Sequence, residues 1–245
     1  FSALGLDDES GEPMQINDHV LQIENEYYSL VRPKQVPQAG ETPAQALKNR
    51  GVGYVELRAV DVNPYSAIGI DEHSAGFLES LALYCLLQDS PDLLAAEQDQ
   101  IEHNQAEVVN RGRAADVQIA VGQSSQPFQV WAEAHLTAIA DCAVLLDQSQ
   151  NSSLYQAAVQ LMQQRIQHVE QTLSAQVIAD TVQHGGTWNF GSVMAEQHVH
   201  SYDEHALSDE RTQYFADLAQ SSWQKQQQLE QEHALSFTAY LAQYR

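Results

Sequence analysis

The chain has 245 residues, enough to bury a substantial core in one large domain or two small ones. Its 11 Lys and Arg residues stand against 33 Asp and Glu residues, which gives a formal net charge of −22 at pH 7. Because this charge opposes phosphate backbones and anionic membrane surfaces, it argues against general nucleic-acid or lipid binding. Solubility alone explains so much acid, so the acidity indicates no particular chemistry.

The two cysteines, Cys85 and Cys142, lie far apart inside apolar runs, without CxxC spacing. This pattern predicts buried, reduced thiols and no disulfide framework. No apolar run reaches the roughly 18 residues that a membrane helix needs, and no signal-peptide pattern opens the chain. We therefore expect a soluble, cytoplasmic protein. The start at Phe1, without an initiator methionine, indicates a fragment or a processed product.

Two short regular elements are expected near the start of the chain. Residues 16–28 alternate loosely between polar and apolar side chains and predict a strand. Three prolines in the next segment argue against a regular central element there, although residues 42–51 predict one or two helical turns that end at Gly51. The same segment brings Arg32 and Lys34 into a chain with few cations.

Strand alternation, a charged pair and a sharp stop occur together in residues 51–71, GVGYVELRAVDVNPYSAIGID. Read with a period of two, Tyr54, Glu56 and Arg58 project to one side and apolar residues project to the other. The spacing of Glu56 and Arg58 is about 7 Å along one strand face. The Asn63-Pro64 pair is typical of a turn and ends the strand.

This charged strand face is the first candidate site. A carboxylate such as Glu56 suits Mg²⁺, which takes hard oxygen ligands, and a guanidinium such as Arg58 suits a phosphoryl oxygen. Glu24, Glu26 and Tyr28 would join the same surface if the two predicted strands were neighbours with aligned polar faces. The alternative is a cross-strand ion pair on a solvated face, which contributes little.

Beyond residue 71 the apolar period changes from 2 to 3.6, which predicts a helical body. The first helix, at about residues 72–89, is apolar nearly all round in its second half and is expected to be buried. Further helices are expected at about residues 90–111, 128–146, 152–182 and 207–235.

Three other features of the helical body come into consideration for a function. His198 and His200 form a His-x-His pattern that could bind Zn²⁺ with a further histidine, but their segment predicts no regular element to fix the geometry. Trp188, in HGGTWNFG, is expected to anchor a loop. The last helix is rich in Gln and Glu and lacks a sustained apolar seam, so it is expected to be solvated.

Three motifs of the β portion resemble the corresponding region of bacterial glutamate–cysteine ligases of the proteobacterial type. They are LQIENEYYSLVRPK (21–34), GETPAQAL (40–47) and the segment 51–71 described above. Their order and spacing match those of the family. The resemblance is strong over about residues 1–90 and weaker in the helical body.

The resemblance implies an α+β fold, in which part of a curved antiparallel sheet, like the active-site floor of glutamine synthetase, precedes a mainly helical body. Residues 1–70 would contribute to an ATP and Mg²⁺ cradle, and residues 71–245 would form the helical body. The implied reaction is the ATP-dependent ligation of L-cysteine to the γ-carboxyl of L-glutamate through γ-glutamyl phosphate, the first step of glutathione biosynthesis. Glu56 resembles a Mg²⁺ ligand of the family. Arg58 resembles the catalytic arginine that contacts the terminal phosphate of the nucleotide, and Tyr28 resembles a tyrosine of the cysteine pocket.

The chain also departs from the family, whose enzymes are about twice as long. Their amino-terminal half supplies most metal-binding carboxylates and the arginines that hold the substrates. We therefore expect this chain to be the carboxyl-terminal part of one larger catalytic domain, inactive alone and a monomer once the missing half completes it. Two alternatives remain: a related ligase with another amine acceptor, and a non-catalytic binding protein descended from the ligase.

Overall fold

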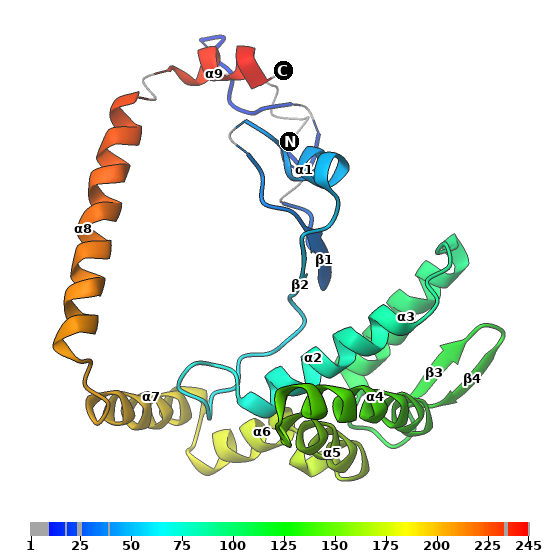
Figure 1. Cartoon of the computed structure of the whole chain (residues 1–245). Helices are drawn as coiled ribbons and strands as arrows, with labels where there is room; N and C mark the ends of the chain where they lie inside the picture. The colour runs from blue at the N-terminus through cyan, green and yellow to red at the C-terminus, as the bar shows by residue number, and fades with distance from the viewer. Residues whose placement is uncertain (1–9, 18, 24–25, 39, 233–234, 245) are drawn as a thin grey trace. The chain divides into compact units, whose positions relative to one another are not determined.

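The structure is a computed structural model that describes residues 10–17, 19–23, 26–38, 40–232 and 235–244. Within these residues the chain is mainly helical and contains two small antiparallel sheets, which confirms the predicted α+β fold (Figure 1). In chain order the elements are β1 (Val31–Lys34), α1 (Pro43–Arg50), β2 (Tyr54–Leu57), α2 (Glu72–Leu87), α3 (Ala95–Arg111), β3 (Gln118–Val121), β4 (Ser124–Pro127), α4 (Phe128–Gln150), α5 (Leu154–Gln167), a 3₁₀ turn (Val169–Gln171), α6 (Leu173–Gln183), α7 (Thr187–Asp203), α8 (Asp209–Glu232) and α9 (Phe237–Tyr244).

The described residues divide into two compact units. The first contains the residues up to Asp61 together with those from Ala206 onward, and the second is Val62–His205. The first unit therefore holds β1, β2, α1, α8 and α9, and the second unit holds the other elements.

Strands β1 and β2 pair antiparallel and form the sheet of the first unit. Pro33 of β1 lies opposite Val55 of β2. The Arg58 N–H donates to the Leu30 carbonyl at 2.7 Å. Because pairs with and without hydrogen bonds alternate along an antiparallel ladder, this bond puts Pro33 at a position that makes none. The missing N–H of Pro33 therefore costs the sheet nothing, and a proline is tolerated inside the strand.

One prediction for this region is wrong. The proline-containing segment forms β1, which pairs with β2 alone among the described residues and is therefore not a central strand. Residues 16–28 form no strand where the structure describes them. Local side-chain bonds explain this error. The Gln22 amide accepts from the Ile16 N–H at 2.8 Å and donates to the carbonyls of Asn17 and His19 at 3.1 and 2.7 Å. Such bonds offer the backbone an alternative to sheet pairing.

Helix α1 begins and ends where the sequence predicts. Thr42 and Gln45 form a capping box: the Thr42 hydroxyl accepts from the Gln45 N–H at 3.3 Å, and the Gln45 side chain accepts from the Thr42 N–H at 3.0 Å. After Arg50, Gly51 takes a φ of 71°, in the left-handed region that favours glycine. Gly51 therefore ends the helix and starts the turn into β2.

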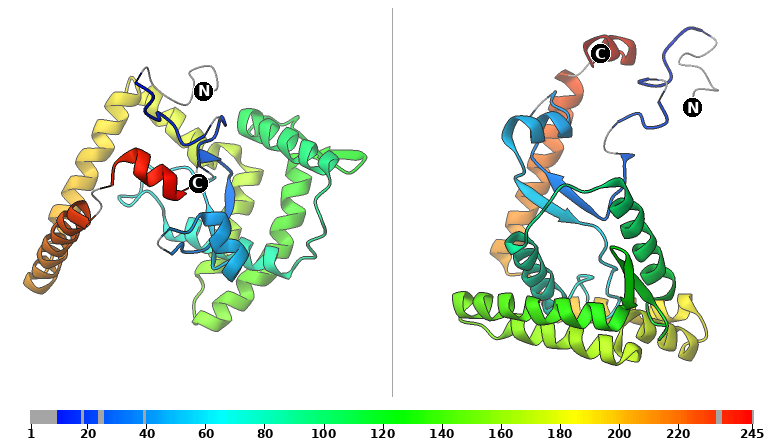
Figure 2. Two further views of the ribbon diagram at one scale, coloured as in Figure 1. Left: turned by 90° about the horizontal axis from the view of Figure 1, so that it is seen from above. Right: turned by 90° about the vertical axis from the view of Figure 1, so that its right-hand side faces the viewer.

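The core of the second unit lies between α2, α4 and α5. Figure 2 shows α4 and α5 running side by side, and side chains of α2 pack against both. Apolar side chains at helical spacing along α4 and α5 meet in this core, as expected for amphipathic helices. The buried members of the core cluster are Leu136, Ile139, Ala143, Tyr155 and Val159.

Helix α2 is present as predicted, but its carboxyl-terminal end is not buried. Leu86 is 79% exposed, and Cys85 beside it is also exposed. Cys142, on α4, is buried as expected, and both thiols are free. The apolar end of α2 therefore belongs to the surface of this unit, and periodicity alone overestimated its burial.

The predicted helix at residues 152–182 is two helices, α5 and α6, because Thr172 starts a new one. Its hydroxyl accepts from the Ala175 N–H at 3.3 Å and caps α6. The segment after Gly186 is helical as well, in α7, so the predicted loop there is wrong. Trp188 lies on α7 with 85% of its surface exposed and does not act as an anchor.

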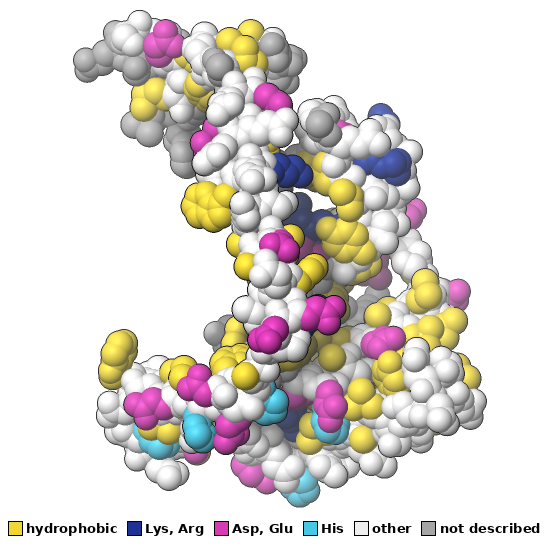
Figure 3. Space-filling model, turned by 60° about the vertical axis from the view of Figure 1, so that its left-hand side comes forward, with side chains coloured by type: hydrophobic (Ala, Val, Ile, Leu, Met, Phe, Trp, Pro, Cys, Tyr) yellow, Lys and Arg dark blue, Asp and Glu magenta, His cyan; other side chains and the backbone are white. Residues whose placement is uncertain are grey.

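Helix α8 confirms the predicted last long helix, and it contains no buried residue. Hydrophobic side chains nevertheless lie at the surface of this helix, with acidic side chains between them (Figure 3). Among the residues that the structure describes, no helix combines the length and the apolar character needed to cross a membrane.

Candidate functional site

The polar side of the β1–β2 sheet gathers three cations around one carboxylate. Arg32 lies directly opposite Glu56, and directly opposed residues of an antiparallel pair share a face. Lys34 and Arg58, each two positions along its strand, project to the same side. We call this set, Arg32, Lys34, Glu56 and Arg58, the cationic face. It is a local reversal of sign in a chain whose net charge is −22.

Glu56 is the centre of this face. The Arg58 Nε lies 2.9 Å from its Oε1, and the Lys34 Nζ lies 3.1 Å from its Oε2. The ion pair with Arg58, followed by that with Lys34, lowers the pKa of Glu56 below its usual value. The carboxyl is therefore ionised at neutral pH, and the cationic face carries three positive charges and one negative charge.

Tyr28 adjoins the cationic face through Arg58. The guanidinium carbon of Arg58 lies 5.7 Å from the centroid of the Tyr28 ring, within the range of a cation–π contact. Tyr28 itself is 63% exposed. The structure thus brings together Tyr28, Glu56 and Arg58, the three residues that the sequence singled out.

The neighbours of these residues differ from the expected ones. Glu24 lies outside the described residues, and Glu26 accepts from the Gln22 N–H at 2.9 Å within its own loop. The cross-strand partners are instead Arg32 and Lys34 of β1. Their i, i+2 spacing across a proline was the signal in the sequence, but the proline argued against reading it as a strand.

Glu56 of the cationic face could supply one oxygen ligand to a metal ion. Oε2 of Glu56 is shielded from solvent, and its contact with Lys34 lacks the direction of a hydrogen bond. This oxygen is therefore held by the ion pair with Lys34 and could still contribute to a metal site. Within the described part of the chain, no three Asp, Glu, His or Cys side chains are grouped as metal ligands. Mg²⁺ at Glu56 would have to take its other ligands from elsewhere, as it commonly does from water and substrate phosphates.

The histidines of the second unit do not form a metal site. His198 and His200 lie on α7, and they belong to no metal-binding group among the residues described. The His198 Nε2 donates to the Pro64 carbonyl at 2.8 Å. His200 lies 3.4 Å from the Glu204 carboxylate one turn later. Their contacts are those of structural residues.

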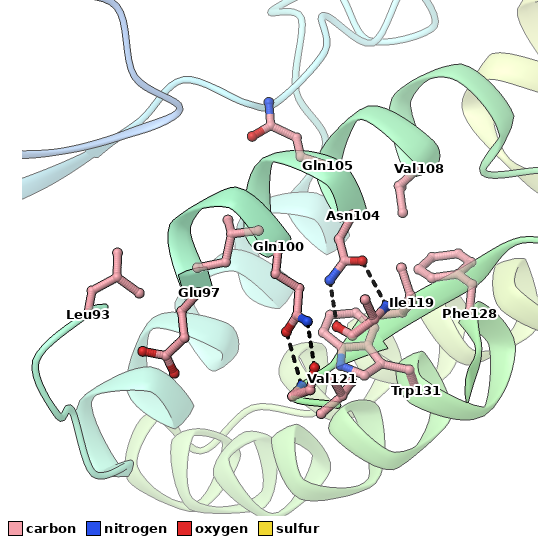
Figure 4. Close-up of a pocket in the computed structure, with 13 residues that line it drawn as sticks. Leu93, Glu97, Gln100, Asn104, Gln105, Val108, Ile119, Val121, Phe128 and Trp131 are labelled. Atoms are coloured by element: carbon pink, nitrogen blue, oxygen red, sulfur yellow. Dashed lines mark hydrogen bonds between the residues drawn. The ribbon is translucent and has the colours of Figure 1, made fainter. Parts of the chain in front are cut away.

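A cavity of about 530 Å³ lies between α3, the β3–β4 hairpin and α4 (Figure 4). The side-chain amides of Gln100 and Asn104, one turn apart on α3, form hydrogen bonds with the backbone along the edge of β3. Asn104 donates to the Ala120 carbonyl and accepts from its N–H, both at 2.8 Å, and Gln100 pairs with Gly122 in the same way at 2.8 and 3.0 Å. These amides are therefore committed to the backbone, and the remaining wall is largely apolar. None of the predicted site residues lines the cavity.

We expect Asn104→Ala to destabilise the second unit by about 1–2 kcal/mol, because it leaves the N–H and carbonyl of Ala120 without partners. Thermal unfolding followed by circular dichroism measures this loss, and hydrogen exchange should show faster exchange at the Ala120 amide. Gln105→Ala is the matched control, since Gln105 points away from the hairpin (Figure 4). Unchanged exchange at Ala120 would show that the amide pairing does not hold the hairpin.

The sequence comparisons point to one family. The sequence profile of the glutamate–cysteine ligase family matches residues 1–108. The chain is 37% identical over 249 aligned residues to the glutamate–cysteine ligase of Hahella chejuensis, a match that covers 100% of this chain and 47% of that protein. It is 38% identical over 237 residues to the enzyme of Pseudomonas putida, covering 96% of this chain and 45% of that protein.

A solved structure agrees with the sequences. The crystal structure of the glutamate–cysteine ligase of Francisella tularensis in complex with AMP superimposes with a TM-score of 0.89 at 30% identity, over 100% of this chain and 48% of that one. The chain thus spans about half the length of the relatives that it matches. It is similar to the bacterial glutamate–cysteine ligases and resembles their carboxyl-terminal half, as the sequence motifs predicted.

Proposed function

We propose that this chain forms part of a ligase that uses ATP to join L-cysteine to the γ-carboxyl of L-glutamate through γ-glutamyl phosphate. The observation that carries this proposal is the cationic face, which lies within the segment matched by the ligase family. Transfer of a phosphoryl group to a carboxylate develops negative charge that positioned cations must stabilise. The relative solved with AMP supports a nucleotide as the partner of such a face.

Arg58 is the residue that we assign to the terminal phosphate of ATP. Its ion pair with Glu56 is made through Nε, so the terminal nitrogens of the guanidinium can donate to phosphoryl oxygens. The ion pair with Glu56 and the contact with the Tyr28 ring hold the guanidinium in place. Arg58 would bind and orient the phosphoryl group and stabilise its charge during transfer.

Glu56 and Tyr28 have separate proposed roles. Glu56 would be one ligand of a Mg²⁺ ion, which supplies further neutralisation of phosphoryl oxygens when bound. Tyr28 would line the pocket for L-cysteine, with its exposed ring beside the reacting end of the site. We further propose that residues 1–70 belong to the ATP cradle, that residues 71–245 support it, and that the complete protein is a monomer whose other half supplies the remaining ligands.

The test is a ligase assay on two proteins: the 245-residue chain and a chimaera in which this chain replaces the matching half of the Hahella chejuensis enzyme. Each is incubated with ATP, Mg²⁺, L-glutamate and L-cysteine, and ADP and γ-glutamylcysteine are quantified. We expect the chimaera to form both products in equal amounts and the chain alone to form neither.

A competition between cysteine and other small amines tests the acceptor. Incorporation of another amine in preference to cysteine would assign the chain to a different carboxylate–amine ligase. A folded chimaera that makes no ADP with any amine would reject the ligase function, provided that its circular dichroism matches that of the parent enzyme.

A further inference from the structure

Among the described residues, Arg32 is the member of the cationic face that makes no ion pair. Glu56 is the carboxylate of this face, and Lys34 and Arg58 already occupy its two oxygens. Within the part of the chain that the structure describes, Arg32 makes neither an ion pair nor a side-chain hydrogen bond. Yet it lies directly opposite Glu56 and is half-buried.

Such an arrangement favours the binding of an anion. A half-buried guanidinium has five N–H donors, and leaving them unpaired costs free energy. Lys34 and Arg58 on the same face add repulsion between like charges. The Glu56 carboxylate makes its ion pairs with those two residues and makes none with Arg32. The excess of positive charge on the face therefore suits a ligand with more than one negative charge.

We infer that Arg32 binds the phosphate chain of the nucleotide as a second cation beside Arg58. This inference rests on the proposed function, because that function supplies the polyanion. A guanidinium presents a planar fork of donors that matches two oxygens of a phosphate, whereas an ammonium acts as a point charge. Lys34, held on Glu56 Oε2, is a positioning residue for the carboxylate, and Arg32 is the residue free to contact the ligand.

The experiment is isothermal titration of the 245-residue chain with ADP in the presence of Mg²⁺, at one fixed salt concentration. We expect Arg32→Gln to raise the Kd for ADP by about 10- to 100-fold, the usual effect of losing a charge-assisted hydrogen bond. Arg32→Lys keeps the charge but loses the fork and should weaken binding less. Arg113→Gln is the matched control, because Arg113 is an exposed arginine of the other unit. Circular dichroism verifies that each variant is folded.

The outcomes separate this inference from the proposed function. If Arg58→Ala weakens ADP binding and Arg32→Gln does not, the inference is wrong and the role of Arg58 stands. A wild-type chain that does not bind ADP also overturns the inference, whereas the ligase assay on the chimaera decides the proposed function independently. A parallel titration with L-glutamate tests the ligand class: if Arg32→Gln affects glutamate binding and leaves ADP binding unchanged, Arg32 binds a substrate carboxylate and the inference fails.

Discussion

Replacing Arg58 with alanine is expected to lower kcat/KM for γ-glutamylcysteine formation by about 100- to 1,000-fold, the usual effect of removing one donor that stabilises transition-state charge. The expectation follows because Glu56 and the Tyr28 ring hold the guanidinium of Arg58, while the ion pair with Glu56 uses only Nε and leaves the terminal nitrogens for a ligand. The measurement is the release of ADP and of γ-glutamylcysteine by the chimaera, because the proposed function assigns the remaining ligands to the other half.

Three variants make this prediction specific. Arg58→Lys keeps a positive charge without the fork and should retain part of the activity. Glu56→Gln is close in shape to the wild type but removes the charge that holds Arg58 and Lys34, and it should lower the rate as well. Arg113→Ala, on the other unit, should leave the rate unchanged. A rate for Arg58→Ala equal to that of the wild type would reject the proposed role of Arg58.

The sequence was sufficient to find the charged residues of β2 because their signal is local. Alternation with a period of two requires only that the segment is a strand, and it placed Glu56 and Arg58 on one face before any partner strand was known. The structure has both residues on that face. The family resemblance then gave each a proposed role, which alternation cannot do.

The partner strand could not be found in the same way, because strand pairing is not local. Pro33 lowered the expectation of a strand in VRPK, since proline removes a ladder donor. Its position opposite Val55, where the ladder makes no bond, is a property of the register and is invisible in either strand alone. Arg32 and Lys34 were therefore noted as cations but not placed on the site.

Among the helices, too, local patterns predicted the elements better than their boundaries and contacts. Periodicity found the helical body and the end of α1 at Gly51, but it joined α5 and α6 into one helix. It also missed the β3–β4 hairpin, although Val117, Ile119 and Val121 alternate with a period of two ahead of Gly122. A run of so few residues was too short to stand out among the surrounding helices.

We expect Asp147→Ala to destabilise the second unit by about 2–3 kcal/mol, a larger loss than that expected for Asn104→Ala. The reason is that Asp147, a residue of α4, caps the start of α5. Asp147 lies near the end of α4 and is 3% exposed. Its carboxylate accepts from the backbone N–H groups of Tyr155 and Gln156 at 3.1 and 3.0 Å and from the Gln156 side-chain amide at 2.9 Å. Ser153, the residue before α5, makes no side-chain capping bond, so Asp147 caps this helix in its place.

The charge of Asp147 makes this contribution dependent on pH. Burial by itself raises the pKa of the Asp147 carboxyl, but the hydrogen bonds from Gln156 and Tyr155 outweigh burial and lower the pKa below its usual value. A carboxyl whose pKa is lower in the folded state stabilises the fold fully above its unfolded pKa of about 4. That stability is lost as the pH falls through the lower folded value. Asp147→Asn keeps the shape and removes the charge, so it should abolish this part of the acid sensitivity.

Thermal unfolding between about pH 3 and pH 7 measures both effects, since the unfolded pKa lies inside that window. At pH 7 the loss in Asp147→Ala should lower the Tm by about 5–10 °C, given the usual scaling for a unit of this size. The matched control is Asp141→Ala, an exposed carboxylate on the same helix. If Asp147→Asn and the wild type lose stability in parallel as the pH falls, the acid sensitivity arises from other carboxylates. Equal stability of Asp147→Ala and the wild type at pH 7 would instead mean that α5 does not need this cap. The turn at Asn151, whose φ is 51°, would then be held by the packing of α4 on α5 alone.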